Sequence, residues 1–158
     1  MQRIRNAQVA GSSPVTSSNM YYFTETGKTI MLEAGIKGLA EVKASEINCA
    51  RVMGSGALDV FATPAMVALL EEAAWKSVQP HLEEGQGTVG TLMNVQHLAA
   101  TPLGMTVRAE TELVSVEGRK LVFTVKAFDE AGLIGEGTHE RFIVVNDKFM
   151  SRTNAKLG

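Results

Sequence analysis

The stretch that decides the fold is FATPAMV at residues 61–67, together with the helix that it begins. Thr63 is a residue type that commonly caps helices, and Pro64 suits the first turn, where a missing N–H costs nothing. At about 100° per residue, the apolar residues that follow fall on one half of a helix that we expect to run to about His81. These residues are Met66, Val67, Leu69, Leu70, Ala73, Ala74 and Val78.

Glu71 occupies an unusual position on this helix. Glu72 and Lys76 take the polar side and form an i,i+4 pair in the favourable order. Glu71 instead lies at the margin of the apolar arc, beside Val67 and Ala74. A carboxylate in that position either reaches solvent at the rim or is held there for a function.

Composition narrows the class of protein. The 158 residues are enough for one domain with a sizeable core, and 45% hydrophobic with 20% charged residues is typical of a globular protein. A net charge of −2 argues against a nucleic-acid partner, and no apolar run approaches the roughly 18–20 residues of a membrane span. The single cysteine, Cys49, excludes an intrachain disulfide framework and favours a reducing, cytoplasmic compartment.

The two ends of the chain differ from its middle. Residues 1–30 begin with a segment rich in Ser and Gly that has no hydrophobic periodicity and no apolar signal-peptide region, so we expect a disordered or extraneous N-terminal arm. The domain proper is expected over residues 31–147, and a polar C-terminal tail over 148–158.

The middle of the chain predicts one strand, one long helix and four further strands. The first strand is expected over Lys43–Met53, where Gly54-Ser55-Gly56 ends it. Short turns join the later strands, so neighbours should be antiparallel, and the apolar half of the helix needs a sheet face to cover it. The later strands are expected at Thr88–Leu98, Met105–Val116, Lys120–Phe128 and Leu133–Val145.

These elements predict an α+β domain in which a curved antiparallel β-sheet wraps around one long central helix, which is the hotdog fold. One helix cannot cover both faces and all edges of such a sheet. We therefore expect a homodimer or a dimer of dimers.

Three residues could act together in catalysis: Thr63, Glu71 and His97. Thr63 and Glu71 share one half of the helix, and alternation along the following strand turns His97 toward it. A hydroxyl, a carboxylate and an imidazole are the groups used in acyl transfer and hydrolysis. Each also has a structural interpretation, as a helix cap, a rim carboxylate and a core histidine. No metal-ligand spacing or phosphate-binding loop is present, so neither a metal nor a cofactor is expected.

Residues 60–144 resemble the fluoroacetyl-CoA thioesterase family of hotdog proteins. The resemblance rests on a series of short motifs at matching spacing. They are VFAT at 60–63, Met66-Val67, Glu71, Gly90-Thr91, His97, AATP at 99–102 with Gly104, VEGR at 116–119 and IGEGTHER at 134–141.

The resemblance implies an enzyme that hydrolyses an acyl-CoA thioester to a free acid and coenzyme A, the latter being part of the substrate. It implies that Thr63, Glu71 and His97 are catalytic, with His97 as general base, Thr63 orienting the acyl group or the water, and Glu71 attacking the carbonyl or positioning the nucleophile. The site in such proteins lies near a dimer interface. The residues assigned to substrate binding are Gly90, whose backbone would contact the substrate carbonyl, Phe61, Ala57, His139 and Arg141.

One departure from the family concerns the substrate. The fluoroacetyl-specific member has phenylalanines just before the VFAT motif, where this chain has Gly54 and Ala57. We therefore expect a more open pocket for a short-chain or small acyl group, without specificity for fluoroacetyl. Two alternatives remain, a non-catalytic acyl-CoA-binding hotdog protein and a hotdog enoyl-CoA hydratase; the hydratase would use an Asp/His pair, which this residue set does not match.

Overall fold

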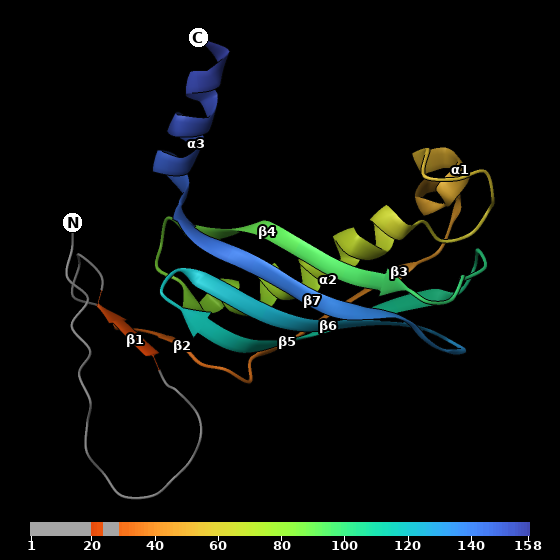
Figure 1. The fold of residues 1–158 in the computed structure, drawn as a ribbon, viewed down its shortest axis with the longest axis horizontal. Coiled ribbons are helices and arrows are strands. Elements are labelled where there is room, and N and C mark those ends of the chain that lie inside the picture. Colours follow the sequence, from red (N-terminus) through yellow and green to blue (C-terminus); the bar gives the residue numbers. More distant parts are fainter. Residues whose placement is uncertain (1–19, 24–28) are drawn as a thin grey trace, which may run out of the picture.

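The computed structural model describes residues 20–23 and 29–158. A short two-stranded ribbon comes first, and the body of the molecule consists of one long helix and a five-stranded sheet (Figure 1). The strands are β1 (Met20–Phe23), β2 (Thr29–Leu32), β3 (Lys37–Lys43), β4 (Gln86–His97), β5 (Thr106–Glu117), β6 (Lys120–Asp129) and β7 (Gly132–Val145). The helices are η1 (Glu46–Asn48), α1 (Ala50–Met53), α2 (Thr63–Val78), η2 (Gln79–His81), α3 (Asn146–Asn154) and η3 (Ala155–Leu157).

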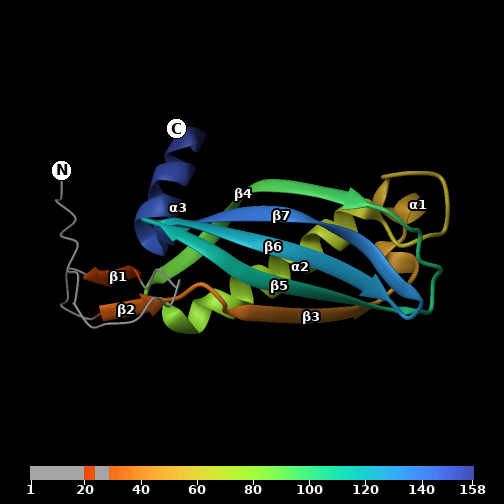
Figure 2. The ribbon, with the colours of Figure 1, turned by 60° about the horizontal axis from the view of Figure 1, so that its bottom comes forward.

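The main sheet is antiparallel throughout, in the order β3-β5-β6-β7-β4. Helix α2 lies along one face of this sheet, and the sheet curves around it (Figure 2). The strands β3 and β4 form the two edges. This is the expected α+β hotdog fold.

The core lies between α2 and the sheet. Six of the seven apolar helix residues identified above are buried, and Val67 is half-buried. Along β6, Leu121, Phe123, Val125 and Ala127 alternate with more exposed residues and all face the helix side, as their spacing predicts. Gly38 allows β3 to approach the helix, because a Cβ there would lie 2.2 Å from the carbonyl oxygen of Ala73. Within residues 20–23 and 29–158, no helix is long and apolar enough to cross a membrane.

The expected strand over Lys43–Met53 is wrong. The strand β3 ends at Lys43, and the chain then turns through η1 and α1. The side chain of Asn48 explains the ending: its Oδ1 accepts a hydrogen bond from the Ser45 N–H (2.8 Å), and its Nδ2 donates to the Lys43 carbonyl (3.0 Å). Such side-chain bonds satisfy backbone groups that a strand would otherwise use.

The segment 148–158, expected as a polar tail, is exposed and polar but helical, in α3 and η3. Helix α3 projects away from the sheet (Figure 1). The arm expected over residues 1–30 falls largely outside the described residues. Its described parts are β1 and the start of β2, which pair as antiparallel strands.

Candidate active site

Thr63 and His97 form the first group of candidate side chains. Thr63 is the first residue of α2, and His97 is the last residue of β4. The Oγ1 of Thr63 lies 2.8 Å from Nδ1 of His97. The helix cap is Ala62, and Thr63 makes no capping bond, so the interpretation of Thr63 as a cap is wrong. Its hydroxyl is committed to the histidine instead.

The His97 ring is half-buried and keeps one nitrogen available. In the described part of the chain, Nε2 is buried and has no hydrogen-bond partner. Burial lowers the pKa of His97 below its ordinary value of 6.5, while the backbone of Ala99 acts in the opposite direction. The imidazole is therefore neutral at pH 7, and a neutral imidazole can accept a proton.

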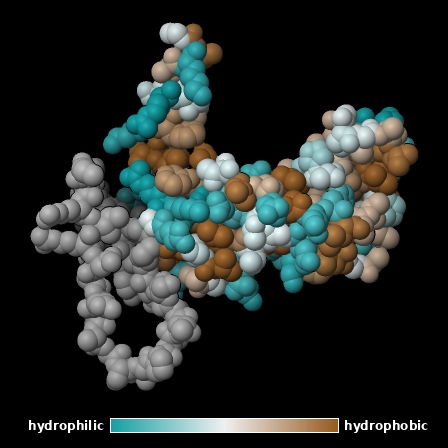
Figure 3. All heavy atoms as spheres, viewed as in Figure 1, coloured by the Kyte–Doolittle hydropathy of each residue, from teal (hydrophilic) through white to brown (hydrophobic). Residues whose placement is uncertain are grey.

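A cavity of about 340 Å³ adjoins this pair. Phe61 and Ala57, two of the residues expected to bind substrate, line this cavity, and its lining includes no Asp, Glu, Lys or Arg side chain. Apolar side chains also gather on the surface at this end of the molecule, around α1 (Figure 3). The lining residues are Ala50, Ser55, Gly56, Ala57, Leu58, Val60, Phe61, Thr63, His97, Leu98, Ala99 and Ala100.

The loop between Arg51 and Asp59 forms one wall of the cavity, and an ion pair joins its two ends. The Nε of Arg51 lies 2.7 Å from Oδ1 of Asp59, and the thiol of Cys49 lies 3.7 Å from the same oxygen. Cys49 is buried. Between Arg51 and Asp59, Gly54 has φ of 75°, a left-handed conformation that disfavours a larger residue there.

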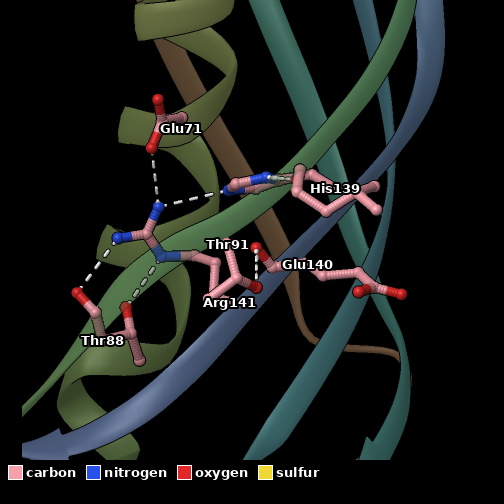
Figure 4. Close-up of polar contacts among 7 residues, drawn as sticks. Glu71, Thr88, Thr91, His139, Glu140 and Arg141 are labelled. Carbon is pink, nitrogen blue, oxygen red and sulfur yellow. Dashed lines mark hydrogen bonds and ion pairs between the residues drawn. The ribbon is translucent and has the colours of Figure 1, made fainter.

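Glu71 belongs to a second group of side chains, farther along α2 (Figure 4). Its Oε2 lies 3.1 Å from Nη1 of Arg141, a buried arginine on β7. The same guanidinium donates to Thr88 twice, from Nε to Oγ1 (2.8 Å) and from Nη2 to the carbonyl (3.0 Å). The carboxylate that looked misplaced on the helical wheel is therefore paired with a cation from the sheet.

His139 completes this second group. It is buried, with its ring stacked on Phe123 at 6.0 Å between centroids. Its Nδ1 lies 2.7 Å from the Leu92 carbonyl, and its Nε2 lies 3.1 Å from Nη1 of Arg141. A carbonyl oxygen only accepts, so Nδ1 carries the proton and Nε2 accepts from the arginine. Burial lowers the pKa of His139, and the nearby Arg141 lowers it further, which matches this neutral form.

A β-bulge in β4 places Gly90 beside Glu71 and Arg141. The register between β4 and β7 shifts between Gly90 and Leu92, and the intervening Thr91 donates its hydroxyl to the Glu140 carbonyl (3.2 Å). A Cβ on Gly90 would lie 2.6 Å from Oε2 of Glu71 and 3.2 Å from Nη1 of Arg141. Bulges of this kind redirect side chains and backbone at functional sites.

The structure thus sorts the expected site residues into two groups. Thr63, His97, Phe61 and Ala57 gather at the start of α2, and Glu71, Gly90, His139 and Arg141 gather farther along it. Thr63 and Glu71 are eight residues apart, or about 12 Å along a helix, and in the structure Glu71 contacts Arg141 whereas His97 contacts Thr63. Thr88 had no sequence signal, because a threonine in a strand is ordinary.

His139 and Arg141 do not line the cavity beside Thr63; they contact each other, and Arg141 contacts Glu71, so their assignment to substrate binding stays a prediction. Across the described ranges, no three His, Cys, Asp or Glu side chains gather in a way that could hold a metal ion.

The fold and its solved relatives define the class: this is a hotdog-fold protein of the thioesterase superfamily. A structure from Thermus thermophilus, a thioesterase superfamily member, superposes with a TM-score of 0.72 at 31% identity, over 77% of this chain and 90% of that one. The structure of the fluoroacetyl-CoA thioesterase FlK superposes with a TM-score of 0.75 at 37% identity, over 79% of this chain and 97% of that one.

The particular family follows from the sequence matches. Residues 44–147 match the family model of the fluoroacetyl-CoA-specific thioesterase FlK. The fluoroacetyl-CoA thioesterase of Streptantibioticus cattleyicolor is 47% identical over 98 residues, which cover 62% of this chain and 70% of that enzyme. The chain belongs to the fluoroacetyl-CoA-specific thioesterase family, a family of thioester hydrolases. FlK variants have been crystallised with fluoroacetate and coenzyme A, and with acetyl-CoA.

Proposed function

We propose that this protein hydrolyses an acyl-CoA thioester to the free acid and coenzyme A. The observation that carries the proposal is the 2.8 Å contact between Thr63 and His97 beside a cavity without charged walls. Membership of a family of thioester hydrolases, and relatives crystallised with acetyl-CoA or with fluoroacetate and coenzyme A, support the same reaction.

His97 is the general base of the proposed reaction. This role requires the tautomer in which Nδ1–H donates to the Thr63 hydroxyl, so that the unpartnered Nε2 holds a lone pair that can take a proton from water. The water oxygen bonds to the carbonyl carbon, the C–S bond breaks, and the proton on His97 passes to the departing thiolate. Thr63 orients the ring or the water, and the Gly90 N–H stabilises the oxyanion, a contribution worth about 3–4 kcal/mol for one donor in other enzymes.

Glu71 has two possible roles in this scheme. It either positions the water or attacks the thioester itself, forming an anhydride that water then opens. The two roles differ in where the water oxygen appears when water opens the anhydride at the carbonyl carbon of Glu71. A single turnover in ¹⁸O-labelled water then leaves the label in the Glu71 carboxylate, and mass spectrometry of the peptide that contains Glu71 detects it; label in the Glu71 carboxylate therefore shows attack by Glu71.

A second copy of the chain would unite the two groups. The strand β4 is a sheet edge twelve residues long, and within the described residues it pairs only with β7. Antiparallel pairing of β4 with β4 of a second copy, about a two-fold axis near the middle of the strand, would bring the Gly90 end of one β4 toward the His97 end of the other. We therefore propose a homodimer in which Thr63 and His97 of one protomer work with Glu71 and Gly90 of the other.

The proposed substrate carries a small, uncharged acyl group. Apart from His97, the cavity lining is apolar or small, and Ala57 lies in it where the fluoroacetyl-specific relative has a phenylalanine. No feature of this wall selects a fluorine atom. A cytoplasmic location, as the lone buried cysteine favours, is part of the same proposal.

Release of free thiol from a panel of acyl-CoA thioesters tests the proposal. Wild type should release thiol, His97→Ala should not, and His81→Ala is the matched control because His81 is exposed and outside both groups. An acyl-CoA-binding protein would bind the same compounds without releasing thiol. An enoyl-CoA hydratase would instead consume the crotonyl-CoA double bond and leave the thioester intact.

A further inference from the structure

We infer that His139 and Arg141 are positioning residues, which hold the Glu71 carboxylate in one orientation through a relay that starts at the backbone of β4. The inference rests on the proposed function, because it assigns a purpose to the placement of a proposed catalytic carboxylate. The relay runs from the Leu92 carbonyl to His139, from His139 to Arg141, and from Arg141 to Glu71 (Figure 4).

Arg141 is the fixed member of the ion pair. Its side chain is 6% exposed, whereas that of Glu71 is 40% exposed. All three of its nitrogens make contacts: Nε and Nη2 donate to Thr88, and Nη1 donates to both His139 and Glu71. A solvent-exposed ion pair contributes little and holds no fixed geometry. Here the guanidinium is immobilised from two sides, so the carboxylate takes its orientation from the arginine.

His139 controls where the Nη1 hydrogens point. The Leu92 carbonyl holds the proton on Nδ1, which leaves Nε2 as an acceptor facing the guanidinium. One Nη1 hydrogen is thereby directed to His139, and the other is left for Oε2 of Glu71. Residues that hydrogen-bond to the neighbour of a functional side chain commonly fix the orientation of that side chain.

The bulge at Thr91 links this relay to the rest of the site. The register shift occurs between Gly90 and Leu92. On one side of it the Leu92 carbonyl contacts His139, and on the other side Gly90, which has no side chain, leaves room for the Glu71 carboxylate. Within the described residues, the Glu71 carboxylate accepts one hydrogen bond, from Arg141 to Oε2, and its other oxygen, Oε1, has no partner. The relay thus restrains one oxygen and leaves the other for the reaction.

A matched pair of substitutions at His139 tests the relay. An asparagine amide can replace Nδ1 and donate to Leu92 but is too short to reach Arg141, whereas a glutamine oxygen can replace Nε2 and accept from Arg141. Each variant loses one buried hydrogen bond, so both should lower the melting temperature to a similar extent. With acetyl-CoA as the probe, we expect His139→Asn to lower kcat at least tenfold with KM within twofold, and His139→Gln to retain about a third or more of kcat.

Equal kcat in the two variants would overturn the relay, and so would a loss that appears only in KM or follows the melting temperature. If neither variant folds, Thr88 supplies a second pair. Thr88→Val removes the hydroxyl that accepts from Arg141 Nε and should lower kcat, while Thr88→Ser keeps it and should restore most of the activity. Equal activity of these two variants would contradict the relay.

A readout that needs no catalysis separates the relay from the proposed function. In ¹H–¹⁵N spectra of the whole protein, the Nη1 protons of Arg141, which face His139 and Glu71, should be slow to exchange with water in wild type and His139→Gln and faster in His139→Asn. If wild type hydrolyses no acyl-CoA, the proposed function fails, and the same spectra still decide the relay. Fast exchange in wild type would overturn it.

Discussion

Thr63 and His97 are 34 residues apart in sequence, yet the hydroxyl of one lies 2.8 Å from the ring of the other. The contact joins the first residue of the central helix to the last residue of the edge strand β4. It leaves the far nitrogen of the imidazole buried without a partner among the described residues. A hydroxyl that does not cap its helix and a histidine nitrogen without a bond fit the catalytic roles proposed for Thr63 and His97.

Removing the Thr63 hydroxyl should impair catalysis without destabilising the helix. Thr63→Ala is expected to lower kcat/KM on the order of 10²-fold, because the base loses the group that orients it. Since Thr63 is exposed and Ala62 is the cap, the free energy of unfolding should change by about 0.5 kcal/mol or less. Urea unfolding and thiol release measure the two effects. A stability loss of about 1–2 kcal/mol, as for a lost helix cap, would show that the hydroxyl is structural.

The pH dependence of hydrolysis should report His97. Burial lowers its pKa below 6.5, so the neutral, basic form persists to lower pH than it would for an exposed histidine. We expect the acidic limb of the kcat/KM profile to have its midpoint below pH 6.5, and activity to be pH-independent from there to neutrality. A midpoint above 6.5 would contradict the assignment of His97 as base.

Stability should also depend on pH through the buried histidines. The pKa values of His97 and His139 are lowered in the folded protein, so the unfolded chain binds more protons below pH 6.5. The contribution of these two histidines to the free energy of unfolding should therefore be constant above about pH 6.5 and decrease as the pH falls below that value. Urea titrations between pH 5 and 8 measure the slope. His139→Gln should make it shallower, and an unchanged slope in that variant would show that His139 does not contribute.

Adding one methyl group at Gly90 should displace Glu71. The Cβ of Gly90→Ala would lie 2.6 Å from Oε2, and Arg141 and His139 stand at 3.2 and 3.4 Å, so the carboxylate has to move. We expect a loss of at least tenfold in kcat with a stability change of about 1 kcal/mol, typical of a tolerated substitution. Gly87→Ala on the same strand is a useful comparison, because the atoms nearest to its Cβ would belong to the side chain of Asn146 and not to Glu71. Equal losses in the two variants would mean that the effect is not specific to Glu71.

Much of the fold could be predicted because its signals are local. Alternation along β6 and the apolar half of α2 both depend on nearest neighbours in the sequence, and both are confirmed. The first strand was misplaced: it was expected over Lys43–Met53, whereas β3 covers Lys37–Lys43 and Asn48 then binds the backbone groups that would have continued it. Helix α3 was missed because its residues are mostly polar and none of them is buried, so the segment was interpreted as a tail.

The site was less accessible to prediction, for a physical reason. The partner of Glu71 is Arg141, 70 residues away, and their contact depends on the curvature of the sheet and on a bulge that no local pattern announces. The alternation of side chains along β4 placed His97 on the face toward the helix. The same kind of reasoning interpreted Thr63 as a cap, because the sequence alone does not show whether a hydroxyl bonds to the nearby backbone or to a distant ring. The separation into two groups appears only in three dimensions.

The central claim is that Thr63 and His97 of one protomer act with Glu71 of another. Mixing the two homodimers His97→Ala and Glu71→Gln, with subunit exchange, tests it most directly by thiol release. Each variant alone should be nearly inactive. A heterodimer has one site with both substitutions and one site with neither, so full random exchange should restore about a quarter of wild-type activity. No recovery, with heterodimers present by mass spectrometry, would contradict the shared site.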